Sequence, residues 1–537
     1  MSGPTSEQAT AVLLAGDAYW PGPQVTFSIA AANAQWTGYA PDAEPFDSHY
    51  ATLGATAAAQ FRSAIGQWDQ VIGLRLTETN DASAAGQIRI AFTDVDRIAR
   101  EDVTGYAYAP PAPGASGPRM AGDVWLDYNL AGSSFVSGGV DYLTMLHEIG
   151  HALGLRHSFG GSTTLPAGYD DVRHTVMSYT PYTDAFLMSV EPAGSNLRVV
   201  GQFVAPTTPM VFDIAALQKR YGADAATGAG DTTYTWSQSQ PMMQTVYDAG
   251  GTDLIDLSTH TRPSIIDLTP GAYSSIAYYS AQAQAAYWSA QYPGGASGIA
   301  EQFAKATTYT WSNNLGIAFG TVMENVQGGS GGDTIGGNFA NNNLNGGAGD
   351  DSLDGADGDN YLRGGDGQDR LQGGAGFDDI NGNMGDDTAS GGGGGDWVVG
   401  GKDRDLLFGD DDDDVIYGNM GADSLSGGNG DDIMRGGQDD DTLSGGAGDD
   451  WLSGDRGGDT LSGGAGADVY RAGTGSAIDR ILDFSRAEGD RVQIDGGVAY
   501  AVAQQGGDTV IDLGQGDSVV LVGISAATLD AGWIFTA

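Results

Sequence analysis

The sequence predicts a chain in three parts: an α+β (mixed) N-terminal domain, an all-β parallel β-roll and a β-rich C-terminal cap. Through residues 21–235, segments whose apolar residues recur with the period of a helix alternate with segments whose apolar residues recur with the period of a strand. A nine-residue Gly/Asp repeat then runs from Gly328 to Arg471 without a slip. Beyond it, short alternating segments continue through residues 472–537. A chain of 537 residues is long enough for several such domains.

The N-terminal part combines both kinds of element. Apolar residues spaced along one face predict helices, and short runs rich in β-branched and aromatic residues predict strands. We expect a leader or short propeptide over 1–20, a domain over 21–235, and a segment over 236–327 that leads into the roll, with 270–320 as a candidate insertion. The predicted strands are 24–30, 74–77, 87–92 and 122–127, and the predicted helices are 51–71, 141–155 and 212–223.

The segment from His147 to His157 carries a metal-binding pattern. His147 and His151 are four residues apart, so they project from one face of a helix. Gly154 permits a positive φ that ends the helix, which lets His157 reach the same ion. Three neutral nitrogen ligands with an open fourth position are typical of a catalytic zinc site. Glu148, beside the first ligand, is suited to take a proton from the zinc-bound water and to pass one to a leaving amine.

This segment matches H-E-x-x-H-x-x-G-x-x-H at every specified position, and Val-Met-Ser-Tyr follows at 176–179 as a methionine turn. The chain therefore resembles the metzincin zinc endopeptidases, and within them the serralysins. The resemblance implies that Met177 lies beneath the zinc. It also implies that Tyr179 either binds the zinc through its phenol or swings away to hydrogen-bond the tetrahedral intermediate. Strand 122–127 matches the metzincin edge strand, which holds the substrate peptide as an added strand.

The repeat reads G-G-x-G-x-D-x-U-x, where U is apolar, and this nonapeptide is the calcium-binding parallel β-roll of RTX proteins. Its glycines permit tight turns, and its aspartate offers hard oxygen ligands to Ca²⁺. Its apolar position eight points inward, into a thin core. Two repeats make one coil, so sixteen repeats predict roughly eight coils. A disordered acidic linker would have no reason to keep this register.

Most repeats carry aspartate at position six. Asn342 and Asn360 stand at that position in two repeats, and Asp403, Asp412 and Asp439 replace the glycine of position four, where they strain the turn or add ligands. Without calcium the stacked carboxylates repel one another. Extracellular calcium modules bind at ~10⁻⁴–10⁻³ M, so we expect the roll to fold after export. The predicted calcium ligands are Asp333, Asp351, Asp369, Asp378, Asp387, Asp396, Asp405, Asp414, Asp423, Asp432, Asp441, Asp450, Asp459 and Asp468.

Composition limits the partners. The formal net charge is −46, from 69 acidic and 23 basic residues. This charge argues against nucleic acid and anionic membranes as binding partners. No apolar run approaches the ~20 residues of a membrane span. The chain has no cysteine and therefore no disulfides. His49, His174 and His260 lack ligand spacing, and we expect no functional role for them. We expect a monomer.

The two ends suggest the route of export. The first residues lack the basic start and the apolar core of a classical signal peptide, so we expect no cleavable N-terminal signal. Residues 529–537 are apolar with an acidic residue among them. In serralysin-like proteins an uncleaved signal at this end is read by a type I ABC exporter. A strand-forming cap without a signalling role would look the same.

Taken together, these features predict a secreted, extracellular zinc endopeptidase that acts on protein or peptide substrates. Its expected cofactors are one catalytic Zn²⁺ and several structural Ca²⁺. Two alternatives remain open. One is a calcium-dependent RTX surface or adhesive protein with a vestigial protease domain. The other keeps the zinc site but restricts it to autoprocessing or to one dedicated protein substrate.

Overall fold

A computed structural model of the chain describes residues 4–39, 49–95, 103–114, 120–161, 163–166, 168–193, 196–305 and 307–537. Two compact units divide the chain. The first comprises Met1–Thr232, Gln238–Gly251 and Pro270–Val322, and the second comprises Thr233–Ser237, Thr252–Thr269 and Met323–Ala537. Each unit is described by itself.

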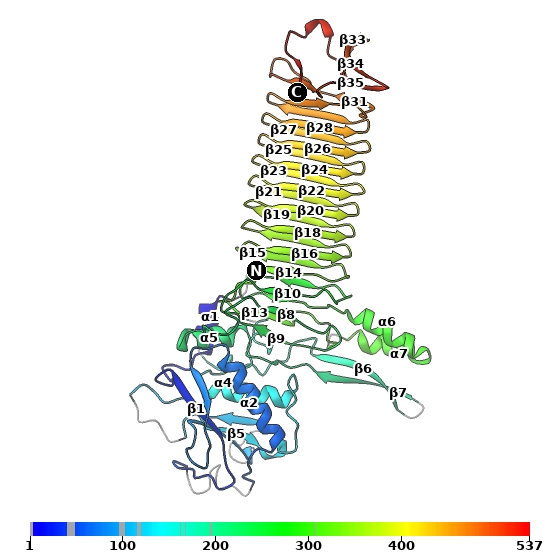
Figure 1. Cartoon of the computed structure of the whole chain (residues 1–537). Helices are drawn as coiled ribbons and strands as arrows, with labels where there is room; N and C mark the ends of the chain where they lie inside the picture. Colours follow the sequence, from blue (N-terminus) through cyan, green and yellow to red (C-terminus); the bar gives the residue numbers. More distant parts are fainter. Residues whose placement is uncertain are drawn as a thin grey trace. The chain divides into compact units, whose positions relative to one another are not determined.

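The first unit contains a five-stranded mixed sheet (Figure 1). Four of its strands run parallel, and the fifth, β4, pairs antiparallel with its neighbour β5. The predicted strands of this region are therefore present, with bounds shifted by one or two residues. In spatial order the sheet consists of β2 (Arg75–Glu78), β1 (Gln24–Ile29), β3 (Ile88–Thr93), β5 (Val124–Asp127) and β4 (Gly105–Ala107).

The predicted role of residues 122–127 as the exposed edge of the sheet is wrong. Strand β5 lies between β3 and β4, and all four of its residues are buried. The edge is β4, which covers the outer side of β5. A strand of three residues, Gly-Tyr-Ala, with no β-branched side chain gives little sequence signal, which explains why it was missed.

Helices cover the sheet and close the core. Phe61, Ile65 and Trp68 lie on one face of α2, as their spacing predicts, and they share an apolar cluster with Leu146 and Ile149 of α4. Helix α1 adds buried residues to the same cluster and begins with a capping box. The helices are α1 (Ser6–Leu13), α2 (Ala55–Asp69), α4 (Val140–Ala152) and α5 (Val211–Tyr221), and a 3₁₀ turn, η2, spans Tyr128–Leu130.

The candidate insertion at 270–320 contains two short helices, α6 (Ala281–Gln291) and α7 (Ala296–Phe303), joined by the 3₁₀ turn η3 (Pro293–Gly295). Their buried residues form a small apolar cluster with Val190 of a separate hairpin. That hairpin consists of β6 (Phe186–Ala193) and β7 (Asn196–Phe203). A three-stranded sheet completes the unit, with β12 (Tyr273–Ser274), β13 (Leu315–Ile317) and β9 (Gln244–Val246) in that order.

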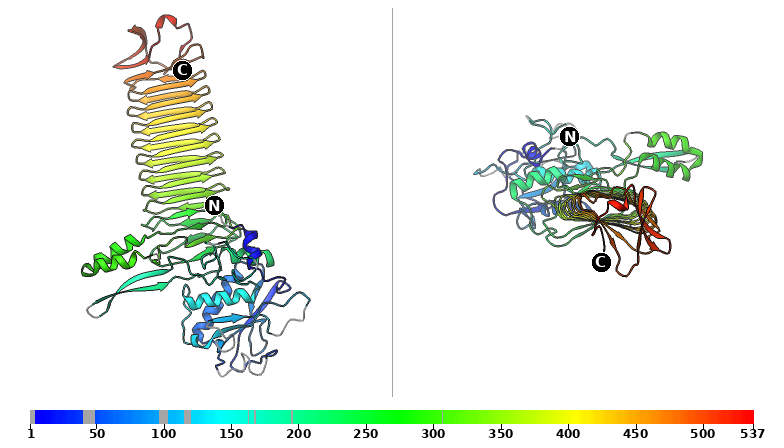
Figure 2. Two further views of the ribbon diagram at one scale, coloured as in Figure 1. Left: turned by 180° about the vertical axis from the view of Figure 1, so that it is seen from behind. Right: turned by 90° about the horizontal axis from the view of Figure 1, so that it is seen from above.

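The second unit is a parallel β-solenoid built from two sheets (Figure 2). Each strand pairs with the strand two further along the chain, eighteen residues away. The nonapeptide tract supplies eight strands to each sheet, which confirms the predicted eight coils. One sheet holds β16 (Asn343–Ala348), β18 (Tyr361–Asp366), β20 (Asp379–Met384), β22 (Trp397–Lys402), β24 (Val415–Met420), β26 (Ile433–Gln438), β28 (Trp451–Arg456) and β30 (Val469–Ala472). The other holds β15 (Thr334–Asn338), β17 (Ser352–Ala356), β19 (Arg370–Ala375), β21 (Thr388–Gly393), β23 (Leu406–Asp411), β25 (Ser424–Asn429), β27 (Thr442–Ala447) and β29 (Thr460–Ala465).

Strands outside the repeats extend both sheets. They bring each sheet to thirteen strands within the described residues, so the solenoid is longer than the repeat tract. At the far end β33, β34 and β35 pair antiparallel and finish the second sheet. The added strands are β8 (Thr233–Thr235), β10 (Leu254–Asp256), β11 (Ile265–Asp267), β14 (Asn325–Gln327), β31 (Ile478–Ile481), β32 (Arg491–Ile494), β33 (Ala501–Gln505), β34 (Asp508–Gly514), β35 (Asp517–Leu521) and β36 (Ile534–Thr536), and η4 spans Ala526–Thr528.

Side chains follow the repeat as predicted. Every apolar residue at position eight is buried, including the small Ala389. The three aspartates at position four, Asp403, Asp412 and Asp439, have φ of 73°, 76° and 74°, a region in which glycine is favoured. These turns are therefore strained, as their composition suggests. In the part of the chain that the structure describes, no helix is long and apolar enough to cross a membrane.

Candidate metal centre

The end of α4 shapes the candidate site. The helix stops at Leu153, and Gly154 follows with φ of 104°. The backbone N–H of Leu155 returns to the carbonyl of Gly150 at 2.9 Å, which closes the turn. Because the chain reverses here, His157 comes back over the face of α4 that carries the other two histidines.

The three motif histidines converge through their Nε2 atoms. Nε2 of His157 lies 3.0 Å from Nε2 of His151 and 3.2 Å from Nε2 of His147. Nδ1 of His147 lies 2.7 Å from the carbonyl oxygen of Val176, and Nδ1 of His151 lies 2.9 Å from that of Leu155. Since a carbonyl only accepts, both Nδ1 atoms carry the proton, and both Nε2 atoms present a lone pair to the common point.

Burial keeps these imidazoles neutral. It lowers the pKa of His147 well below the usual value, and that of His151 to about 4. The pKa of His157 is lowered for the same reason. Nearby imidazoles add to the effect for His147 and His151, because like charges would repel. A neutral imidazole is the form that binds a metal.

Glu148 lies at the same site but has a different environment. Its side chain is buried, and Oε2 has no hydrogen-bond partner within the described residues. Burial raises the pKa of this carboxyl to about 8. Gly105 of β4 is its close neighbour, since a Cβ at that position would lie 3.1 Å from Cγ of Glu148. An orphaned buried carboxylate oxygen is costly and suggests a partner that protein atoms do not supply.

The methionine turn lies against α4. Met177 is fully buried, and its sulfur would lie 2.7 Å from a Cβ on Gly150. Glycine at position 150 therefore makes room for the thioether between the helix and the turn. The same turn carries Val176, whose carbonyl orients His147.

Asp213 of α5 holds this turn, and sequence reasoning missed it. The fully buried carboxylate accepts hydrogen bonds from the backbone N–H groups of Val176 at 2.8 Å and Met210 at 2.9 Å, and from the hydroxyl of Thr175. Burial raises the pKa of this carboxyl to about 7, although the three hydrogen bonds act to lower it. The available signal was an aspartate on the apolar first turn of a predicted helix, where a buried acid needs local donors.

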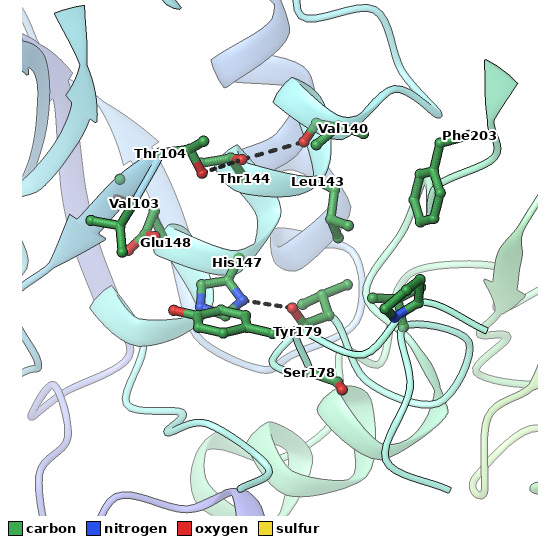
Figure 3. Close-up of a pocket in the computed structure, with 14 residues that line it drawn as sticks. Val103, Thr104, Val140, Leu143, Thr144, His147, Glu148, Ser178, Tyr179 and Phe203 are labelled. Atoms are coloured by element: carbon green, nitrogen blue, oxygen red, sulfur yellow. Dashed lines mark hydrogen bonds between the residues drawn. The ribbon is translucent and has the colours of Figure 1, made fainter. Parts of the chain in front are cut away.

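A cleft of about 400 Å³ opens beside His147 (Figure 3). His147, Glu148 and Tyr179 line it together with β4 and apolar side chains such as Leu143 and Phe203. Tyr179 is 57 % exposed, and its hydroxyl lies 2.9 Å from Nε2 of His157. Sequence reasoning identified His147, Glu148 and Tyr179 and missed Thr104, Thr144 and the apolar wall of this cleft.

The other three histidines lie elsewhere. His174 is buried, with Nδ1 2.8 Å from the carboxylate of Asp171. His260, in the second unit, is buried with Nε2 2.8 Å from the carbonyl of Trp236. His49 lies 3.4 Å from Asp94. None of them belongs to the three-histidine cluster.

The position-six residues of the roll form two ladders. In each ladder the backbone N–H of one residue donates to Oδ1 of the residue one coil further, as between Asp387 and Asp405 at 2.9 Å. Asn342 and Asn360 take part in one ladder. Asp479 and Asp490, which the repeat pattern missed, extend the ladders beyond the tract. Oδ2 is buried without a hydrogen-bond partner in the described chain for every predicted ligand except Asp333, whose Oδ2 accepts from Gly329.

Comparison with known proteins agrees with both patterns. The matrixin family matches residues 46–179, and the RTX calcium-binding nonapeptide repeat matches six stretches between 327 and 477. The chain is similar to serralysins over more than half of its length. It is 29 % identical over 355 residues to Serralysin G and 28 % over 344 residues to Serralysin C, both of Dickeya chrysanthemi, and 30 % over 308 residues to Serralysin of Proteus mirabilis.

These matches cover 63 %, 61 % and 52 % of this chain and 65 %, 63 % and 53 % of the three relatives, in the same order. The chain therefore aligns with about half to two thirds of each relative. The matrixin domain implies a catalytic zinc, and the RTX repeats imply calcium. The residues present fit both ions. Three neutral imidazoles converge on one point, and the roll holds a row of orphaned carboxylate oxygens beside glycines that leave no room for a side chain.

Proposed function

We propose that the chain is a zinc-dependent endopeptidase that hydrolyses proteins or peptides. The observation that carries the proposal is the convergence of three histidine Nε2 atoms beside a buried carboxylate. In this proposal His147, His151 and His157 hold the zinc, and backbone carbonyls fix two of these rings. Zinc, when bound, supplies a Lewis acid that polarises the scissile carbonyl and lowers the pKa of water toward ~7.

Glu148 is the proposed general base and acid. Its carboxylate lines the cleft beside His147, within reach of a water that attacks a bound peptide. It accepts the proton of that water and later delivers a proton to the leaving amine. The phenol of Tyr179 either completes the ligand set or donates a hydrogen bond to the oxygen that becomes negative. Its side chain is 57 % exposed, so solvent surrounds much of the ring.

The substrate backbone binds along β4 in this proposal. This strand is the last one in the order of the described sheet, and Val103, Thr104 and Gly105 line the cleft. An extended peptide added there forms main-chain hydrogen bonds that any sequence can provide. The apolar wall that contains Leu143 and Phe203 then receives one substrate side chain next to the scissile bond.

The roll is the proposed calcium-dependent folding module. Its position-six aspartates bind Ca²⁺ and remove the repulsion between stacked carboxylates. We propose that the protein is exported by a type I ABC exporter and is a monomer outside the cell. The proposed domain boundaries are 1–20, 21–235, 236–327, 328–471 and 472–537.

The test combines metal analysis with a protease assay on the full chain. The purified protein is expected to contain one zinc per chain and to hydrolyse unfolded casein, and a zinc chelator is expected to abolish hydrolysis until zinc is restored. Glu148→Gln is the matched variant, because it keeps the shape of the side chain and cannot accept the proton. It should retain zinc and lose hydrolysis, and full activity in this variant would contradict the assignment.

A further inference from the structure

The two sheets of the solenoid share one repeat but differ in their outward side chains. We call the outer side of the even-numbered strands from β16 to β30 the even face. The outer side of the odd-numbered strands from β15 to β29 is the odd face. Positions seven and nine of the repeat point outward on both. On the odd face these positions carry mostly Ser and Thr, as in Ser424, Thr442 and Thr460. The fold therefore tolerates small polar residues there.

On the even face half of these positions carry large apolar or aromatic residues, and the other half carry polar or charged ones. Five successive strands form an unbroken row at position seven, and each residue pairs with the next across the sheet. Trp397 is 45 % exposed and Ile433 is 44 % exposed. Since the odd face does without such a row, the stability of the coils does not require it. A contiguous exposed row of apolar side chains of this kind marks a binding surface. The row consists of Trp397, Val415, Ile433, Trp451 and Val469.

A polar groove runs beside this row. One section has a volume of about 960 Å³ and is lined by Tyr361, Arg363 and Lys402, together with the amides of Asn381, Asn383 and Asn419. A second section of about 480 Å³ continues it from Asn419 to Arg471. Tyr361 is the aromatic residue of this lining, and the guanidinium of Arg363 lies 3.4 Å from its ring centroid. The amides and guanidinium groups of the groove, with the tryptophans of the neighbouring row, suit a ligand with flat apolar faces and many hydroxyl groups, which is the chemistry of a sugar ring.

The basic residues of the tract collect on the same face. The repeat tract contains seven Lys and Arg residues, and five of them lie on even-numbered strands and line the groove. Three of these five, Arg363, Arg435 and Arg471, form ion pairs with aspartates. The remaining two are Lys402 and Arg456. Asp366, Asp455 and Asp495 line the same groove, so its charge is mixed. Lys402 and Arg456, which form no ion pair in the described chain, are the cations that remain to pair with an anionic ligand.

Two strands of this face carry an aromatic residue at one end and a basic residue at the other. Trp397 and Lys402 begin and end β22, and Trp451 and Arg456 begin and end β28. The two strands are three positions apart in the sheet, which is about 14 Å. We propose that the even face binds an acidic polysaccharide. Sugar rings stack on Trp397 and Trp451, and uronate carboxylates or sulfates pair with Lys402 and Arg456.

The binding test uses the full calcium-loaded chain and polygalacturonate, a linear polymer of uronic acid, with dextran as the neutral comparison. Calorimetry at a fixed calcium concentration should detect binding of polygalacturonate that weakens as NaCl rises, because salt screens the charge pairs. Dextran should not bind. The doubly substituted variants Trp397→Ala/Trp451→Ala and Lys402→Gln/Arg456→Gln should each weaken binding by about tenfold or more.

The matched control is on the odd face. Leu406 is 42 % exposed, and Leu406→Ala/Arg370→Gln removes one apolar and one basic residue from that face. This variant should bind within about twofold of the unmodified chain, as expected for surface substitutions outside a site. Circular dichroism in calcium checks that all variants fold. The proposal is overturned if polygalacturonate does not bind, if dextran binds equally well, if the control loses as much affinity, or if the row instead joins two copies of the chain in sedimentation.

Discussion

The carboxylate of Asp213 accepts a hydrogen bond from the backbone N–H of Val176 at 2.8 Å. The carbonyl of the same Val176 accepts from Nδ1 of His147 at 2.7 Å. An acid on α5 therefore fixes, through the backbone of the single residue Val176, the orientation and the tautomer of the first proposed zinc ligand. Partners of this kind orient the ligand ring and raise its basicity.

Asp213→Asn is expected to weaken zinc binding. The amide nitrogen of asparagine is a donor, so one of the three donors that now point at the carboxylate loses its acceptor. The turn shifts, and zinc affinity should fall by roughly 10–100-fold, the usual cost of losing such a partner. Competition with a fluorescent zinc chelator measures this directly.

Asp81→Asn is the control for this variant. Asp81 is also an acid that accepts several hydrogen bonds, from Arg89, Ser28 and the backbone of Ala31, and none of them touches the metal centre. It should lower the stability of the first unit and leave the zinc affinity of the folded protein unchanged. Equal zinc affinities for the two variants would contradict the positioning role of Asp213.

Gly105→Ala is expected to slow catalysis without removing zinc. A Cβ on Gly105 would lie 3.1 Å from Cγ and 3.3 Å from Oε1 of Glu148, which is tighter than ordinary packing. The carboxylate must then move, and a displaced base loses about tenfold or more in rate. Values of kcat on a peptide substrate and zinc content are the measurements. Gly132→Ala, where the new methyl group meets nothing within 4 Å, should keep the original kcat.

Sequence reasoning succeeded where spacing along the chain determines the structure. The positions of His147, His151 and His157 depend on one helical turn and one glycine, and the inward position eight depends on a nine-residue period. Both are local patterns. The residues that were missed depend on contacts distant in sequence. Asp213 acts on a turn 37 residues away, and Phe203 reaches the cleft from a hairpin with no motif of its own.

The edge of the sheet illustrates the same limit. Residues 122–127 had the stronger strand pattern, and the short β4 had almost none. Which of the two lies outermost depends on antiparallel pairing, which a single strand pattern does not encode. The difference between the even face and the odd face of the roll is a related case. Successive nine-residue repeats alternate between the two faces, so the outward residues of one face recur every eighteen residues, and a pattern read with a period of nine does not distinguish the faces.

Phe203→Ala is expected to change substrate preference more than overall activity. The ring forms part of the apolar wall of the cleft, away from the histidines. Its loss should reduce kcat/KM for peptides with a large apolar residue beside the scissile bond by about tenfold, mainly through KM, and should change peptides with alanine there much less. The comparison requires one peptide pair differing at that residue. Equal losses for both peptides would show that the ring supports the fold and not the specificity.

The calcium-free roll is expected to be more stable in mild acid than at neutral pH. Burial raises the pKa of its ladder carboxyls, to about 6 for Asp378 and about 8 for Asp405 and Asp441. An unfolded aspartate has a pKa near ~3.9, so between about pH 4 and pH 8 the folded roll binds more protons than the unfolded chain. Its free energy of unfolding therefore falls as pH rises through this range.

Calcium should reverse this dependence, because it binds the ionised carboxylates and competes with protons. Thermal unfolding followed by circular dichroism, in a calcium chelator and in excess calcium, measures both trends. In the chelator, the unfolding temperature of the roll should fall from pH 5 to pH 8, and in calcium it should rise. A chelated roll that became more stable toward pH 8 would mean that its ladder carboxylates are already ionised and paired without the metal.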